Sequence, residues 1–96
     1  MQDIKLGENG FYIGDEAAPL ADIEISRKED LTIVIEHTRV SESLKGQGIG
    51  GRLVEAVVEL ARKEGVKILP LCSYARAYLQ KKPEYADLLV KLQSGQ

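Results

Sequence analysis

The segment from Lys45 to Gly51, KGQGIGG, contains four glycines and leads into a stretch with the apolar pattern of a helix. Glycine adopts left-handed conformations and lets the backbone approach a ligand closely. The first N–H groups of a helix have no intrahelical acceptor and lie at the positive end of the helix dipole, which favours phosphate oxygens. The segment therefore predicts a phosphate-binding turn. The alternative is that its glycines only turn the chain and let the helix pack.

Two known nucleotide-binding motifs fit this segment poorly. The first, second and last of the four glycines satisfy the G-x-G-x-x-G spacing of dinucleotide-binding folds. That fold also needs a tight turn directly after a strand, an acidic residue about 20 positions later and a second strand–helix–strand half. Here a polar stretch at 41–45 intervenes, Leu71 and Cys72 stand where the acid is expected, and the chain is too short for a second half. A nucleotide-triphosphate loop fails too, because no Gly-Lys-Ser/Thr follows.

His37 and Cys72 are the only histidine and the only cysteine. His37 has an ordinary pKa of about 6.5, which suits a general base near neutral pH. It follows Ile35 in strand phase, so the alternative is a partly buried structural imidazole. Glu36, on the opposite face of a regular strand, is the alternative base. Cys72 is predicted at the carboxyl end of a strand and before a helix, where ligands of α/β proteins collect and the thiol pKa falls. Otherwise it is a small buried side chain.

Two tyrosines and two lysines follow Cys72. Tyr74 and Tyr78 lie one helical turn apart, and one of them could donate a proton or stack against a ligand, although such tyrosines are more often packing residues with a solvated hydroxyl. Lys81 and Lys82 are interpreted as a solvated helix end, with contact to a phosphate as the alternative.

The elements that must position these residues follow from hydrophobic periodicity. Alternating apolar residues from about Leu20 to about Arg39, interrupted by the polar segment 27–30, predict an antiparallel hairpin. Two shorter strands, near 4–6 and 11–13, are predicted before it, with glycines at the turns.

The strongest helix prediction runs from Gln47 to Glu64, where the apolar period is about 3.6, and Gly65 is the expected C-terminal glycine. Val66 to Leu71 is predicted as a short buried strand. The region from Thr32 to Leu71 therefore predicts one strand–helix–strand unit with parallel pairing and a right-handed crossover.

Pro70 cannot donate a ladder hydrogen bond, so the second strand of this unit should be unpaired on at least one side near its end. Beyond it, residues 74–82 are predicted to be helical, and Pro83 is predicted to begin a last helix through Leu92. The final residues, 94–96, are expected to fray.

The bulk composition bounds the class of protein. A length of 96 residues predicts one domain, 1–96, with a single core and a largely open site. The 13 Lys and Arg nearly cancel the 15 Asp and Glu, so neither a nucleic acid nor an anionic membrane is expected as a partner. One cysteine permits neither an internal disulfide nor a Cys-rich metal site, and no metal is predicted. The chain starts with neither a basic nor an apolar segment, which predicts a cytoplasmic protein.

The segment from Val40 to Leu53, VSESLKGQGIGGRL, resembles the acetyl-CoA motif of the GNAT superfamily of N-acetyltransferases, whose core is Arg/Gln-x-x-Gly-x-Gly/Ala. Lys45 stands where the superfamily usually has Arg or Gln, which keeps a polar side chain with a different hydrogen-bond geometry. The short length, Glu36-His37-Thr38 before the motif and Leu69 to Ala75 after it narrow the likeness to the minimal GNAT-like family. This resemblance covers nearly the whole chain.

The resemblance implies an α/β fold of the α+β kind. In this reduced GNAT fold, mostly antiparallel N-terminal strands precede one βαβ unit, whose parallel pair splays apart around pantetheine, and helices follow at the C-terminus. It also implies acetyl-CoA as cosubstrate and an amine acceptor, either a small amine or a protein lysine. The residues expected at the cosubstrate are Thr38, Val40, Lys45, Gly46, Gln47, Gly48, Ile49, Gly50, Gly51, Arg52, Tyr74 and Tyr78.

Acetyl transfer needs a neutral amine, stabilisation of the oxyanion and a proton for the departing thiolate. The catalytic candidates are Cys72 and His37, with Glu36 as the alternative base. Cys72 would attack covalently, protonate the leaving thiolate or only line the site. The alternative function is a non-catalytic CoA-binding or protein-interaction module on the same fold, and a purely structural protein is the third. Exposed strand edges are compatible with a monomer or a dimer.

Overall fold

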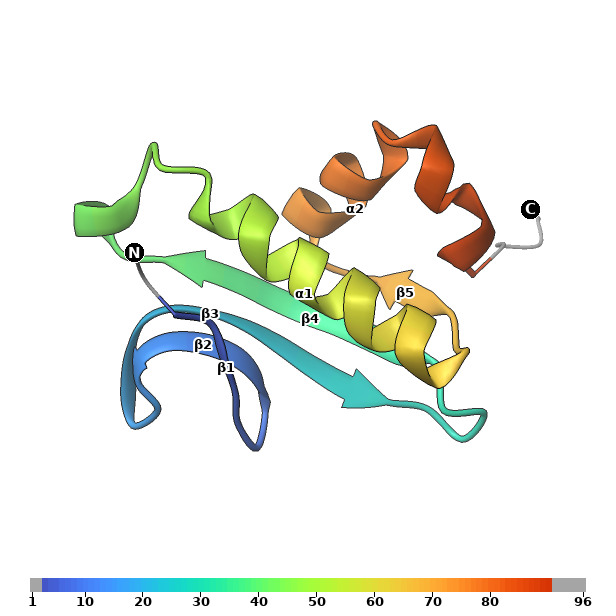
Figure 1. Cartoon of the computed structure of the whole chain (residues 1–96), viewed down its shortest axis with the longest axis horizontal. Coiled ribbons are helices and arrows are strands. Elements are labelled where there is room, and N and C mark those ends of the chain that lie inside the picture. The colour runs from blue at the N-terminus through green and yellow to red at the C-terminus, as the bar shows by residue number, and fades with distance from the viewer. Residues whose placement is uncertain (1–2, 91–96) are drawn as a thin grey trace.

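The computed structural model describes residues 3–90 and contains one sheet with its helices on one side (Figure 1). The strands are β1 (Lys5–Leu6), β2 (Gly10–Asp15), β3 (Ala18–Arg27), β4 (Ile33–Val40) and β5 (Ile68–Pro70). The helices are η1 (Glu42–Leu44), α1 (Ile49–Glu64), α2 (Ser73–Gln80) and η2 (Pro83–Leu88), of which η1 and η2 are 3₁₀ helices.

The sheet has the strand order β1-β2-β3-β4-β5. The first three pairings are antiparallel, and only β4 and β5 pair in parallel, across the connection that contains α1. This arrangement confirms the predicted α+β fold with one βαβ unit.

The core lies between α1 and the middle of the sheet. On α1, Leu53, Val57 and Ala61 are buried completely, and from the sheet Ile23 and Ile35 are equally buried. Burying a side chain of this kind stabilises the fold by about 1.5–3 kcal/mol. The apolar stripe that predicted the helix is thus the face that holds α1 to the sheet.

Helix α1 begins at Ile49 and not at Gln47 as predicted. Gly46 and Gly48 have φ values of 82° and 73°, in the left-handed region, so the chain cannot continue a right-handed helix through them. The C-terminal prediction is confirmed, because Gly65 has φ 71° and caps the helix through N–H groups bonded to the last turn.

A β-bulge in β4 places each later residue on the face opposite to the one that regular alternation from Ile35 would give it. Ile25 pairs with Ile35 and Glu24 pairs with His37, so Glu36 is an extra residue on β4. Because the strand is not regular, the prediction that His37 shares the phase of Ile35 is wrong, and His37 is exposed.

Beyond the bulge, Thr38 is paired with Ile23 and Val40 is paired with Ala21, two residues of the core. Residues opposite each other in an antiparallel pair point to the same face. Thr38 and Val40 therefore face α1, whereas His37 and Arg39 lie on the face away from it.

Strand β5 leaves β4 early. The two strands are paired only as far as Ile35 and Pro70, after which the N–H groups of Leu71 and Cys72 both donate to the Ile35 carbonyl, at 3.0 and 3.2 Å. On the outer side of β5, the bridge found within residues 3–90 joins Ile68 to Leu89. Among residues 3–90, Pro70 is thus paired only with β4, as expected for a strand that is unpaired on one side near its end. Beyond Ile35, β4 stays paired with β3 up to Val40, and only its edge towards β5 is unpaired.

The predicted last helix is wrong in type and in length. A 3₁₀ helix, η2, ends at Leu88, and the next two residues run alongside β5, where the Val90 N–H donates to the Ile68 carbonyl at 3.0 Å. The outer edge of β5 offers backbone acceptors, and pairing with them ends the helix. The rest of the predicted helix and the predicted fraying of 94–96 lie outside the described residues.

Candidate functional site

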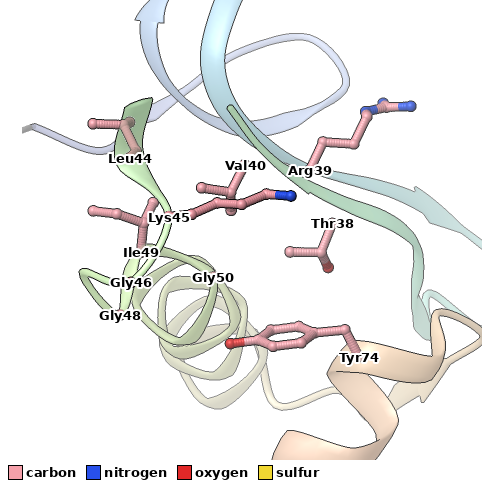
Figure 2. Close-up of a pocket in the computed structure, with 10 residues that line it drawn as sticks. All are labelled: Thr38, Arg39, Val40, Leu44, Lys45, Gly46, Gly48, Ile49, Gly50 and Tyr74. Carbon is pink, nitrogen blue, oxygen red and sulfur yellow. The ribbon is translucent and has the colours of Figure 1, made fainter. Parts of the chain in front are cut away.

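A cavity of about 500 Å³ opens between the C-terminal part of β4, whose edge towards β5 is unpaired, and the start of α1 (Figure 2). Its wall combines strand, glycine loop and α2, and consists of Thr38, Arg39, Val40, Leu44, Lys45, Gly46, Gly48, Ile49, Gly50 and Tyr74. Segments far apart in the sequence thus meet at one place. Most residues predicted for a phosphate-bearing ligand share this wall, but Gln47 does not, and its Nε2 lies 3.5 Å from the Ser43 carbonyl.

The wall formed by β4 has a free backbone edge, since the pairing with β5 ends at Ile35. In Figure 2 the Thr38 and Val40 side chains lie at the cavity, and the Arg39 side chain points away from it. Arg39 donates to Asp22 at 3.1 Å and to Glu24 at 2.7 Å. These two contacts raise the pKa of Arg39, that with Asp22 most, so Arg39 is a fixed cation on the other face of the sheet.

The four glycines of the loop fall into two pairs. A Cβ built on Gly46 or Gly48 would meet nothing within 4 Å, so these positions need glycine for their positive φ alone. A Cβ on Gly50 would lie 2.8 Å from the Tyr74 hydroxyl oxygen, and one on Gly51 would lie 2.8 Å from Cε2 of Tyr78. For Gly50 and Gly51, the alternative that glycine lets the helix pack is therefore correct.

The start of α1 is open to a ligand. Gly48 is the N-cap, and no side chain of the described residues caps the helix. The Arg52 N–H donates to the Gly48 carbonyl at 3.1 Å, the first bond of the helical ladder. The N–H groups of residues 49–51 precede it and point out of the helix end beside the cavity, where they can bind an anion.

Cys72 is the N-cap of α2, as predicted from its place between strand and helix. Its half-buried Sγ lies 3.5 Å from Oγ1 of Thr38, a residue of the cavity wall. Burial alone would raise the pKa of Cys72, but the hydrogen bond with Thr38 and the backbone amides of Ala75 and Tyr74 outweigh it and lower the pKa. The surroundings of Cys72 thus stabilise its thiolate relative to that of an ordinary cysteine.

The two candidate bases are not brought to this cavity. Glu36 accepts a hydrogen bond of 2.6 Å from the Ser26 hydroxyl, and His37 is exposed on the face away from α1. Neither residue lines the cavity. The bulge at Glu36 is the reason that His37 lies on the face away from the cavity. No signal in the sequence reveals this bulge.

Comparison with known proteins decides the family. Residues 10–88 match the family model of the GCN5-related N-acetyl-transferases. The chain belongs to this family. It is also similar to the NMR solution structure of a "GCN5-like putative N-acetyltransferase" from Staphylococcus aureus, with 46% sequence identity and a TM-score of 0.78 over 95% of this chain and 90% of that chain. The resemblance to GNAT proteins is thereby confirmed, and the protein is an acetyltransferase of the GCN5-related family.

A second cavity of the acetyltransferase, of about 470 Å³, adjoins the first. Gly48 and Tyr74 line both. Three other residues predicted at the cosubstrate line only the second, namely Gly51, Arg52 and Tyr78. Lys82 places its Nζ 5.3 Å from the centroid of the Tyr78 ring, so it packs on an aromatic face and is not simply a solvated helix end.

Glu55 is the residue of this region that the sequence interpretation missed. Its carboxylate accepts hydrogen bonds of 2.6 Å from Tyr78 and from Tyr85. The sequence gives only one indication of this contact. Glu55 stands beside the apolar stripe of α1, and tyrosines occur on two elements that follow.

Residues 3–90 of the acetyltransferase contain neither a candidate membrane span nor a cluster of metal ligands. No helix in that range has the length and the apolar character needed to cross a membrane. Within the same range no three side chains among His, Cys, Asp and Glu are grouped to hold a metal ion.

Proposed function

We propose that the protein is an acetyl-CoA-dependent N-acetyltransferase that transfers an acetyl group to an amine. The observation that carries the proposal is the cavity in which the edge of β4 that β5 leaves unpaired meets the start of α1, which no side chain of the described residues caps. The edge of β4 offers peptide groups that pair with no other strand, and the start of α1 offers N–H groups with no acceptor in the helix. An extended ligand with amides at one end and phosphates at the other can therefore bind both elements.

In this proposal the pyrophosphate binds at the N–H groups of residues 49–51, with Gly46 and Gly48 shaping the turn. Lys45 adds a positive charge. It is exposed, and its ion pair with Glu42, at 3.4 Å, contributes little in water, so the side chain can turn to a phosphate. The amides of pantetheine extend along β4 at Thr38 and Val40.

The chemistry proposed for Cys72 follows from its position beside Thr38 and from its lowered pKa. A lowered pKa increases the fraction of thiolate, which is a nucleophile and has no proton to donate, so these features favour the nucleophilic role. In that route Sγ bonds to the acetyl carbon, the bond from that carbon to the CoA sulfur breaks, and CoA leaves as the thiolate. The amine then attacks the acetyl-cysteine, and the bond to Sγ breaks.

The proton of the acceptor amine is proposed to pass to His37. His37 is exposed on the open face of the sheet, beside the parted strands, from where an acceptor can approach. Glu36 is the less suitable base, since its carboxylate is engaged by Ser26.

The test is incubation with radiolabelled acetyl-CoA and a panel of small amines and lysine-containing peptides, together with calorimetric titration of CoA. Transfer to any amine supports the proposal. Binding of CoA without transfer to any amine contradicts catalysis, and no binding contradicts both.

A non-catalytic CoA-binding module is the second candidate. One observation favours it, which is that the cavity wall, within the described residues, contains neither an imidazole nor a carboxylate side chain.

Intact-mass measurement after mixing with acetyl-CoA alone tests the covalent route. An acetyl adduct in the wild type and its absence in Cys72→Ala are expected. A Cys72→Ala variant that retains full activity would show that the transfer is direct.

A further inference from the structure

Three elements meet at one carboxylate. Glu55 lies on α1, and its two oxygens each accept one hydrogen bond of 2.6 Å, Oε2 from Tyr78 on α2 and Oε1 from Tyr85 on η2. All three side chains are half-buried. One residue of α1 thus holds both C-terminal elements.

Both tyrosine rings are also held from other sides. The Tyr78 ring packs against Gly51, where there is no room for a Cβ, and Nζ of Lys82 lies 5.3 Å from its centroid. The guanidinium of Arg62 lies 5.7 Å from the centroid of the Tyr85 ring. These contacts place each ring so that its hydroxyl group meets Glu55.

The carboxylate is held in its charged form. Burial alone would raise the pKa of Glu55, but the hydrogen bonds from the two tyrosines and the charge of Lys82 outweigh it and lower the pKa. The hydrogen bond to Glu55 in turn raises the pKa of Tyr85 to about 12, and burial together with the same carboxylate raises that of Tyr78. Hydrogen bonds to a charged group are stronger than those between neutral groups.

Helix α2 carries the groups that face the candidate site. Cys72 is its N-cap and lies 3.5 Å from Thr38 of β4, and Tyr74, in its first turn, forms the cavity wall opposite β4. A shift of α2 along or away from α1 would change the separation of Cys72 and Thr38. The contact at Glu55 is on the same side of α2 as this wall, since Tyr74 and Tyr78 are one turn apart with ring centroids separated by 6.4 Å.

We propose that Glu55 is a positioning residue, which holds α2 against α1 through Tyr78 and Tyr85 and thereby sets the distance between Cys72 and Thr38. Its consequence for catalysis rests on the proposed function. Its consequence for the Cys72 thiol does not, because the environment of a thiol can be measured without any turnover.

The first experiment measures the rate of alkylation of Cys72 by iodoacetamide between pH 6 and 10. The variants are Glu55→Gln, which removes the charge, and Tyr85→Phe, which removes one hydroxyl and keeps the ring on Arg62. The matched control is Glu59→Gln, an exposed glutamate one turn further along α1. Cys72 is the only thiol in the chain.

In both variants the inflection of the alkylation profile is expected to move to higher pH, because a displaced α2 weakens the contact with Thr38. At pH values below the inflection of the wild-type profile the rate should fall about threefold or more, since it follows the thiolate fraction. Glu59→Gln should match the wild type.

The second experiment measures kcat and KM for acetyl-CoA well below the melting temperature of each variant. An increase in KM in Glu55→Gln and Tyr85→Phe is expected. If no amine is acetylated by the wild type, the proposed function fails, and the alkylation profile still decides the role of Glu55.

Unchanged alkylation profiles together with a lower melting temperature in both variants would overturn the inference, because Glu55 would then only stabilise the fold. If Glu55→Gln does not fold, Tyr85→Phe alone decides, since it removes a single hydroxyl group. A shifted profile in the Glu59→Gln control would also contradict the inference, because the effect would not be specific to the contact.

Discussion

The two glycine pairs of the loop, Gly46 with Gly48 and Gly50 with Gly51, have the same appearance in sequence and different physical roles. The first pair stands in open space with left-handed backbone angles. The second pair lies in the first turn of α1 and leaves room for the tyrosines of α2. A glycine-rich motif at a helix start therefore combines a requirement of the backbone with a requirement of the neighbouring helix, and substitution can separate the two.

The largest effect is expected for Gly51→Val. The added side chain meets the Tyr78 ring, which cannot yield because Glu55 holds its hydroxyl group. Overpacking of this kind, with the lower helix propensity of valine, should reduce the free energy of unfolding by about 2–3 kcal/mol. Urea denaturation measures it. In a double-mutant cycle with Tyr78→Ala the losses should be less than additive, and strict additivity would show that the ring is not the obstacle.

A smaller loss, about 1–2 kcal/mol, is expected for Gly48→Ala, because an L-residue is strained at φ 73°. Calorimetry should also show weaker binding of CoA, since the turn would deform. D-Alanine at position 48, introduced by chemical ligation, fits the left-handed conformation and is the matched control. If it is as unstable as L-alanine, space and not backbone geometry is limiting at this position.

Alkaline pH should weaken the hydrogen bonds of the tyrosines to Glu55, beside the second pair, and leave the backbone at Gly46 and Gly48 unaffected. The folded state raises the pKa of Tyr85 to about 12, so it holds the phenolic proton more tightly than the unfolded chain does. The corresponding stability is fully present below the unfolded pKa of about 10 and is lost as pH rises through about 12. Absorbance at 295 nm should show part of the tyrosine titration only near pH 12. Glu55→Gln should bring that part to lower pH, and a late titration that persists in this variant would contradict the assignment.

The smallest effect is expected for Gly50→Ala, within about 0.5 kcal/mol of the wild type. The obstacle here is the far end of Tyr74, a side chain with an exposed fraction of 46%, which can turn outward. The gain in helix propensity from glycine to alanine, about 0.5–1 kcal/mol, offsets much of the cost. Thermal melting measures the difference. A loss as large as that of Gly51→Val would show that Tyr74 is as firmly held as Tyr78.

Periodicity was sufficient to predict the hairpin, helix α1 and the parallel strand after it, because each of these elements buries a face with its own apolar repeat. The glycine loop and the place of Cys72 followed from the same pattern. Residues 83–90 were not predictable in this way, since their structure depends on the free edge of β5, which is a property of the sheet and not of the local sequence.

The candidate site was predicted well where it depends on backbone position and poorly where it depends on side-chain direction. Thr38 and Val40 are at the cavity and His37 is not, because Glu36 is an extra residue relative to β3. Nothing in the alternation of β4 marks that residue. The Glu55 contact was missed for a similar reason, since its partners are 23 and 30 residues away and come together only when α2 and η2 pack on α1.

The bulge at Glu36 makes the shape of the site depend on a single codon. Without Glu36 the pairs on either side of it, Ile25 with Ile35 and Glu24 with His37, would become neighbours in a regular ladder, and every later residue would keep its present face. Bulges bend and twist a strand. An in-frame deletion of this codon would therefore straighten β4 beside the cavity, so the gain or loss of one residue here changes the shape of the site without changing which side chains face it.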